Sequence, residues 1–295
     1  AHPNFLNGLA ISSQVLFKAL GQYRRSSLEG TRAKNEQIER GLLRYFTRCI
    51  VKTTPYSTFC RLAAGRFRSA RGAPPSDSAA QTIALDHTTS HIRLNKYYCG
   101  VIMQHLAARP EVVRQLPVGL NPTVERSAER VCFLAEENGR EVFREMGWTR
   151  ALDAVFACSA GLGGVPLRDL AERLVRAPGV EAEPAEAESY LLELTRLGLL
   201  SLSFGISAQE VDWDEPLHGL LVRLEDPHAR ELATVVESLR ECAVEYSAAD
   251  PDRRQSLLTR STTMLRHAVE TLRMPLPMAG IETPLLEDAS VPGTL

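Results

Sequence analysis

The sequence predicts a mixed α+β protein in which a winged helix-turn-helix module is inserted into a lobe of helices and strands. Its 295 residues are 44% hydrophobic and 24% charged, as in a globular chain with room for two domains. Amphipathic helical stretches lie on both sides of a middle segment that has the pattern of three strands followed by three helices. We therefore expect a first part at residues 1–118, the module at 119–204, and a third part at 205–295 that returns to the first lobe.

The N-terminal quarter is expected to contain helices and one strand. Residues 5–20 begin with mixed apolar spacing and continue as a short helix near Ser13. Residues 38–52 form a longer helix, because apolar side chains recur there at helical spacing. These side chains are Ile38, Leu42, Tyr45, Phe46, Cys49 and Ile50. Pro55 ends that helix, since a residue before proline avoids the helical region, and the alternation in 59–67 predicts a strand.

One face of the helix at 38–52 is strongly basic. Arg40, Arg44, Arg48 and Lys52 follow one another at intervals of four residues and form a ridge of like charges. Residues 18–71 hold thirteen Lys and Arg against three acidic residues, a charge of +10, so the rest of the chain carries −12. This asymmetry indicates a polyanionic partner, nucleic acid first. The alternative is a solvated basic face beside an ordinary turn.

Farther along, we expect a helix over 92–106 and then the inserted module. Its strands are predicted at 121–126, 130–135 and 140–145, with a hairpin turn at 137–139.

Three helices follow these strands. Thr149 caps the first, Pro166 begins the second, and Pro184 begins the third, which Gly198 ends. Winged modules often bind DNA, but this third helix is acidic, which argues against that role. Its acidic residues are Glu186, Glu188 and Glu193.

Two long helices and a proline-rich tail complete the chain. Asp226-Pro227 and Asp250-Pro251 mark the helix starts, and the short connection between the helices predicts an antiparallel hairpin. The tail at 274–295 contains an acidic pair, Glu287-Asp288.

The composition excludes several kinds of site. No apolar run approaches the roughly 20 residues needed to cross a bilayer, and no secretory signal is visible. The six cysteines lack metal-ligand spacing, and His87 and His91 have no HExxH around them, so we expect no metal site. There is no P-loop. We expect a cytoplasmic protein with reduced thiols and no bound cofactor.

The stretch from Arg48 to Phe59 resembles a known family. Arg48-x-x-x-Lys52-x-Thr54-Pro55-Tyr-Ser-Thr-Phe59 is similar to the Arg-x-x-x-(Arg/Lys)-x-(Ser/Thr)-Pro-(Phe/Tyr)-x-x-Phe motif of lantibiotic dehydratases, within their N-terminal glutamylation domain. Its form is similar to the actinobacterial branch. Other stretches agree in order, so the resemblance spans nearly all of the chain.

The resemblance implies an enzyme of antibiotic biosynthesis that acts on a ribosomal precursor peptide. The family domain moves glutamate from glutamyl-tRNA, its co-substrate, onto Ser or Thr, and a separate or C-terminal elimination domain later removes it. The ester is already activated, so neither ATP nor metal is required. The family normally has sequence before Ala1 and after Leu295, so we expect a fragment or truncated relative that is inactive alone.

The resemblance also implies a set of site residues. Arg48 and Lys52 would bind anions and Thr54 would position a hydroxyl. Asn95 stands where the family usually has Asp, so it can form hydrogen bonds but cannot act as a base. Asp288 matches an acidic position near the glutamylation site. Contacts to tRNA are expected from Arg40, Arg44, Arg61 and Arg66.

The module at 119–204 resembles the family's precursor-peptide recognition element. There the leader segment of the peptide adds as a strand beside the third strand and rests on the third helix, which is β-augmentation. The matching positions are Arg140, Val142, Phe143, Tyr190, Leu191 and Leu194. The alternative is that the apolar members belong to the core.

Two other functions remain open from the sequence. One is a peptide aminoacyl-tRNA ligase, a relative that extends a peptide C-terminus and would normally need ATP. The other is a non-catalytic scaffold that binds the leader peptide, which Asn95 would permit.

Overall fold

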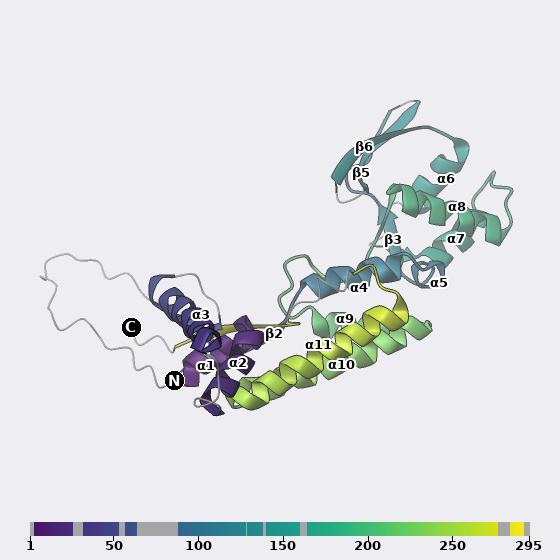
Figure 1. The fold of residues 1–295 in the computed structure, drawn as a ribbon. Coiled ribbons are helices and arrows are strands. Elements are labelled where there is room, and N and C mark those ends of the chain that lie inside the picture. Colours follow the sequence, from purple (N-terminus) through teal and green to yellow (C-terminus); the bar gives the residue numbers. More distant parts are fainter. Residues whose placement is uncertain are drawn as a thin grey trace, which may run out of the picture. The chain divides into compact units, whose positions relative to one another are not determined.

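The computed structural model describes eight segments of the chain: residues 3–25, 32–52, 57–63, 88–127, 129–137, 140–159, 164–276 and 284–291. It is a mixed α+β protein, as the sequence predicts (Figure 1). Contacts divide it into two compact units. The first comprises Ala1–Asn95, Val235–Thr271 and Leu276–Leu295, and the second comprises Lys96–Thr234 and Leu272–Pro275. The predicted module at 119–204 lies within the second unit, and its boundaries stay a prediction.

The first unit begins with three helices, α1 (Pro3–Ser12), α2 (Gln14–Arg25) and α3 (Arg32–Val51). Ser13 separates the first two and caps the second, because its Oγ accepts a hydrogen bond from the amide of Leu16 at 3.3 Å. Leu9, Ala10 and Phe17 form the buried centre of this group. Helix α1 packs so closely on Phe59 that a Cβ at Gly8 would lie 2.6 Å from the ring, so this position requires glycine.

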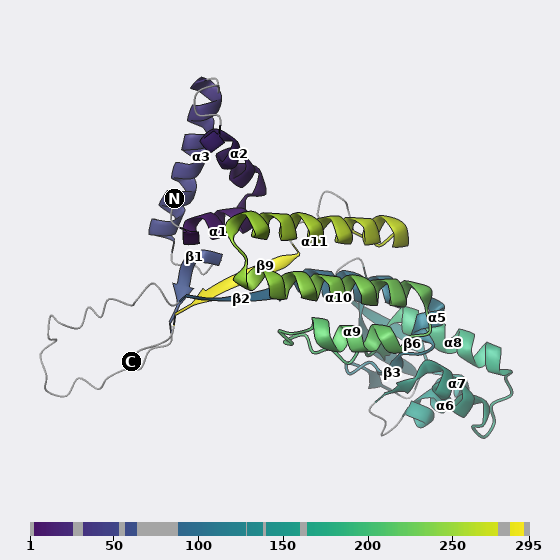
Figure 2. The ribbon, with the colours of Figure 1, turned by 90° about the horizontal axis from the view of Figure 1, so that it is seen from below.

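A three-stranded sheet completes the N-terminal part of the unit. Strand β9 (Leu285–Ser290) lies between β1 (Ser57–Leu62) and β2 (Thr89–Leu94), parallel to the first and antiparallel to the second (Figure 2). The strand predicted from Phe59 is confirmed as far as Leu62, and its last four residues lie outside the described segments.

The helix predicted to begin at Ile92 is wrong at its start. Residues up to Leu94 form β2, and α4 (Tyr97–Ala107) begins only at Tyr97. The reason is tertiary, because β2 pairs residue by residue with β9 from Thr89↔Ser290 to Leu94↔Leu285. A partner nearly 200 residues away leaves no trace in the local periodicity.

The predicted helical hairpin is confirmed as α10 (Pro227–Ala248) and α11 (Pro251–Leu272). Asp226 Oδ1 accepts a hydrogen bond from the amide of Ala229 at 3.0 Å, and Asp250 Oδ1 accepts one from the amide of Arg253 at 2.9 Å. Both aspartates therefore act as N-caps. From Val235 onward, α10 lies beside α11 within the first unit (Figures 1 and 2).

The second unit holds two small sheets. Strands β4 (Glu125–Arg126), β5 (Arg130–Glu137) and β6 (Arg140–Gly147) form an antiparallel sheet in that order, close to the three predicted strands. The other sheet, in the order β7-β3-β8, was not predicted. Its strands are β3 (Pro117–Leu120), β7 (Val165–Pro166) and β8 (Leu200–Leu202). Helices α5 (Pro110–Val113) and α9 (Asp214–Arg223) were not predicted either.

Helices α6 (Arg150–Ser159), α7 (Leu167–Val175) and α8 (Pro184–Leu197) confirm the three helices predicted after the strands. Thr149 Oγ1 accepts a hydrogen bond from the amide of Leu152 at 3.2 Å, as expected of an N-cap. Gly198 ends α8 with φ 85°, and a Cβ there would lie 2.9 Å from that of Ala135. Glycine alone satisfies both conditions.

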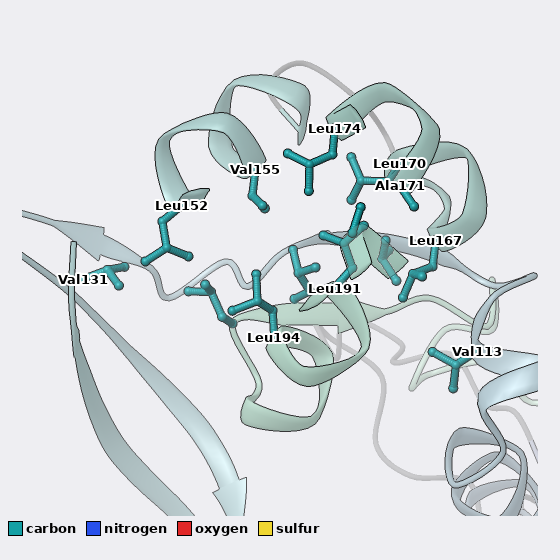
Figure 3. Packing of buried hydrophobic residues seen from close by; sticks show 14 of the residues in the cluster. Val113, Val131, Leu152, Val155, Leu167, Leu170, Ala171, Leu174, Leu191 and Leu194 are labelled. Atoms are coloured by element: carbon teal, nitrogen blue, oxygen red, sulfur yellow. The ribbon is translucent and has the colours of Figure 1, made fainter. Parts of the chain in front are cut away.

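These helices enclose the apolar core of the second unit (Figure 3). Leu152, Leu167, Leu170, Leu191 and Leu194 are each at most 1% exposed. Within the described part of the chain, no helix is both long and apolar enough to span a membrane.

Candidate functional site

The C-terminal end of α3 brings the family-like motif to the sheet of the first unit. The Lys52 carbonyl accepts a hydrogen bond from Cys60 Sγ at 3.0 Å, and the Lys52 amide donates one to the Arg48 carbonyl at 3.0 Å. The second bond closes the last turn of α3, and the first joins that turn to β1. The side chains of Arg48 and Lys52 are exposed, so they are accessible to an anion. Thr54 and Arg66 lie outside the described residues.

Strand β9 presents two adjacent carboxylates to opposite sides. Burial alternates along it, with Leu285, Glu287 and Ala289 buried and the residues between them more exposed. Asp288 forms an ion pair with Arg93, whose side chain is 39% exposed against 31% for that of Asp288. This side of the sheet therefore carries an oriented, accessible carboxylate.

Glu287 on the other side is enclosed by hydrogen-bond donors. It accepts bonds from Ser57 Oγ at 2.5 Å, Ser90 Oγ at 2.8 Å and Arg254 Nη1 at 2.6 Å. The Arg254 side chain is 3% exposed and that of Glu287 is 0%.

Arg254 is itself fully engaged. It donates to the carbonyls of Ala249 at 3.0 Å and Ser247 at 3.2 Å, and it lies 4.6 Å from the centre of the Tyr246 ring.

This buried pair was not predicted from the sequence, although a signal was present. Arg254 precedes Leu257, Leu258 and Leu265 at helical spacing, so a cation stands on the apolar face of α11. Glu287 likewise alternates with Leu285 and Ala289 on the buried side of β9. A charged residue on a face that must be buried indicates a buried partner.

Asn95 does not lie beside Asp288 in the sheet. Its amide donates a hydrogen bond to the Pro284 carbonyl at 2.7 Å, beyond the last pair of β2 and β9. Asp288 is paired with His91, four residues earlier on β2, which corresponds to roughly 13 Å along a strand. The structure therefore does not place Asn95 opposite Asp288.

The basic ridge of α3 is exposed, and so is part of the apolar stripe predicted beside it. Ile38 is buried and Leu42 and Tyr45 are half-buried, but Phe46 is 55% exposed and Ile50 is 70% exposed. The predicted single stripe is wrong because Phe46 and Ile50 lie about 80° or more around the helix from Ile38. They therefore form a second, accessible apolar face.

A groove of about 800 Å³ lies between α2 and α3 beside the ridge. Its lining includes Val15, Leu16, Ile38, Arg40, Gly41 and Arg44. Arg61 lies apart from the ridge in β1, where it pairs with Ala289, and its Nε is buried without a partner among the described residues.

The predicted peptide face of the second unit is divided between surface and core. Phe143 is 69% exposed on β6, and Val142 is half-buried against the core. Leu191 and Leu194 are 0% and 1% exposed, so they belong to the core and cannot contact a bound peptide directly. This corrects the expectation for both leucines, because their positions on α8 face α6 and α7 (Figure 3).

Tyr190, one residue before Leu191, is half-buried beside a cavity of about 310 Å³. Burial raises the pKa of its hydroxyl, and a hydrogen bond with Thr149 opposes that shift. Arg150 and Val180 also line the cavity.

The hydrogen-bond pattern of β5 and β6 decides which backbone groups face the open edge. The amide of Trp148 donates to the Glu129 carbonyl at 2.8 Å, so these residues form a hydrogen-bonded pair. Such pairs recur at every second residue of an antiparallel ladder, which makes Ala135 and Val142 another one. The N–H of Val142 therefore points to β5, whereas that of Phe143 points away from it. Among the described strands, β6 pairs with β5 alone.

The sequence as a whole matches the family model described as "Lantibiotic dehydratase, N terminus" over residues 1–293. The chain belongs to the lantibiotic dehydratase family. A search of curated proteins found no match.

Solved structures of glutamylation domains share this dehydratase fold. The "Glutamylation domain, TbtB, from thiomuracin biosynthesis" has 22% identity and a TM-score of 0.65. The same domain bound to 5'-phosphodesmethylglutamycin has 22% identity and a TM-score of 0.66. The tRNA-dependent lantibiotic dehydratase MibB from Microbispora sp. 107891 has 14% identity and a TM-score of 0.67.

All three similarities cover 98% of the dehydratase chain described here. The chain spans only 32% of the TbtB chains and 27% of MibB. At these identities the likeness establishes the fold.

Proposed function

We propose that this lantibiotic dehydratase chain takes part in transferring glutamate from glutamyl-tRNA to Ser or Thr side chains of a precursor peptide. The observation that carries the proposal is the position of the motif. Arg48 and Lys52 end α3 at β1, and β9 in the same sheet carries the accessible Asp288. Exposed cations and an oriented carboxylate are the groups that this reaction requires.

In the proposed reaction, the hydroxyl oxygen of the peptide forms a new bond to the glutamyl carbonyl carbon. The bond from that carbon to the tRNA ribose oxygen breaks. Asp288 accepts the proton of the attacking hydroxyl and returns it to the departing ribose oxygen. Arg48 and Lys52 hold the glutamate carboxylate or tRNA phosphates and stabilise the oxyanion. Thr54 contributes a hydrogen bond. Asn95 is not opposite Asp288, so its hydrogen bonds would go to a part of the substrate farther from the reacting atoms.

Arg40 and Arg44 extend the cationic surface along α3, and Arg61 and Arg66 complete the proposed tRNA contacts. An acceptor end bound along this ridge would place its glutamyl ester at the sheet. Support comes from the exposed side chains of Arg40 and Arg44 and from the +10 charge of residues 18–71.

The second unit supplies the proposed peptide site. Strands β4–β6 followed by α6–α8 have the element order of a winged helix-turn-helix, and β6 offers an edge to an added strand. Phe143 and Tyr190 would contact the leader peptide, with Val142 and Arg140 beside them. Leu191 and Leu194 support this surface from the core.

The test is to incubate the chain with glutamyl-tRNA and a candidate precursor peptide, and then to measure the mass of the peptide by mass spectrometry. A glutamyl adduct on Ser or Thr supports the proposal. A C-terminal extension that requires ATP identifies a peptide aminoacyl-tRNA ligase instead, and peptide binding without any adduct identifies a scaffold. Because this chain spans 32% of the TbtB chain, the assay is repeated with any longer reading frame that contains this sequence. We expect the adduct only there, since a catalytic site needs positions fixed within about 0.5 Å.

A further inference from the structure

The buried pair of Arg254 and Glu287 joins four separate elements of the first unit. Glu287 lies on β9, its serine partners lie on β1 and β2, and Arg254 lies at the start of α11. Ser57 and Glu287 are 230 residues apart in the sequence. All three hydrogen bonds to the carboxylate hold β9 against its neighbours.

Stability alone does not account for a charged pair at this place. Two charges lose their hydration on burial, and apolar side chains of similar volume often serve a core equally well. The neighbours of Glu287 on the same side of β9, Leu285 and Ala289, are apolar and buried. What an apolar residue at position 287 could not supply is a directed bond to the Ser57 hydroxyl.

Ser57 is the point at which β1 departs from regular geometry. Its φ of 50° lies in the left-handed region, which a residue with a Cβ seldom adopts. The register also shifts here, because Ser57 is paired with Asp288 while Arg61 is paired with the next residue, Ala289. Four steps of β1 thus correspond to one step of β9. Because β1 leaves the regular ladder between these two pairs, the position of Ser57 depends on contacts other than the ladder itself.

We propose that Glu287 and Arg254 are positioning residues, which hold Ser57 and the irregular start of β1 in one register and thereby place Asp288 relative to the motif. This inference rests on the proposed function, because it holds that the fixed register of β1 serves glutamyl transfer. Glu287 faces away from the open side of the sheet and does not touch the reacting groups. Its effect passes through Ser57, three residues after Thr54 in the sequence, and through its neighbour Asp288.

The main test replaces both charges at once, with Arg254→Met and Glu287→Leu in the same chain. Removing both partners avoids leaving one buried charge unpaired. The matched control is Arg253→Met with Glu245→Leu, an ion pair of exposed side chains that joins Arg253, the residue before Arg254 on α11, to Glu245 on α10. Hydrogen exchange is measured by mass spectrometry in the full chain, without any substrate. We expect about tenfold faster exchange confined to Ser57–Leu62 in the first variant and no change in the control.

The same variants are then assayed for glutamyl transfer in whichever form of the protein is active. A displacement of the site lowers kcat by about 100-fold and leaves KM for glutamyl-tRNA nearly unchanged. A pair that serves stability alone would instead speed exchange throughout the first unit and leave kcat of the folded protein unchanged. That result overturns the proposal.

Ser57 provides a second test with milder changes. Ser57→Ala removes the hydroxyl and keeps the Cβ that opposes the left-handed conformation, whereas Ser57→Gly removes both. If the carboxylate holds this conformation, the glycine variant retains slower exchange and more activity than the alanine variant. If the serine only fills space, alanine is tolerated better, and the proposal fails. Should neither the unsubstituted chain nor a longer protein that contains it form an adduct, the proposed function fails, while the exchange comparison still decides whether the pair fixes β1.

Discussion

Glu287 and Asp288 are neighbours on one strand, and each is bound to an arginine, yet their surroundings are opposite. Glu287 and Arg254 are buried, whereas Asp288 and Arg93 are about one-third exposed. An exposed pair contributes at most about 1 kcal/mol, because water screens it. The two faces of the sheet therefore differ: the inner face holds a buried ion pair, and the outer face carries an accessible carboxylate.

The largest expected effect comes from breaking the inner pair on one side only. Arg254→Ala leaves the Glu287 carboxylate buried without its cation and should lower the free energy of unfolding by about 3–5 kcal/mol. Urea denaturation measures the change. The control Arg253→Ala, one residue earlier and exposed, should cost less than about 1 kcal/mol. Equal losses of unfolding free energy in the two variants would contradict the expectation that a buried ion pair contributes more than an exposed one.

The outer carboxylate should show the reverse behaviour. Asp288→Asn keeps the size of the side chain but removes its ability to accept a proton, so glutamyl transfer should fall by about 100-fold or more. Its melting temperature should stay close to that of the unsubstituted protein, because the pair with Arg93 is exposed. Transfer at the normal rate would show that Asp288 is not the base.

A second pair of neighbours, Val142 and Phe143, extends the comparison to β6. Phe143→Pro removes the N–H that faces the open edge, so leader affinity should fall by about tenfold. Val142→Pro instead removes a hydrogen bond to β5, so it should lower stability. Phe143→Ala separates the side-chain contribution from the backbone. Fluorescence polarisation with a labelled leader measures the affinity, and equal binding by the folded Phe143→Pro variant would indicate another docking surface.

The smallest effect is expected from the exposed charges of α3. Replacing Arg44 and Arg48 with Ala should reduce the slope of log affinity for tRNA against log salt by about two units, one for each phosphate contact. Arg266→Ala, an exposed arginine of α11, is the control. Filter binding over a range of salt concentrations gives the slope. A slope that does not change would remove tRNA as the partner of this ridge.

Several site assignments could be reached from the sequence, and others could not. The apolar spacing of α8 placed Leu191 and Leu194 on its inner face, but it could not tell a core contact from a peptide contact. The resemblance pointed to Asp288 and passed over Glu287. The local pattern places Glu287 on the same side of the strand as Leu285 and Ala289, but it does not name the partner that a buried carboxylate needs. The two carboxylates differ in burial only because β1 and β2 pair with β9 and one side of the strand is covered.

By itself, the sequence determined the elements whose causes are local. Asp250 and Thr149 cap their helices, Gly198 ends α8, and Glu137 of β5 pairs with Arg140 of β6, all between residues that are close in the sequence. Only the tertiary structure decided that β9 lies between β1 and β2 and that Arg254 meets Glu287. Caps and turns are satisfied by neighbours in the chain, whereas a strand pair or a buried ion pair depends on partners that the folded chain alone brings together.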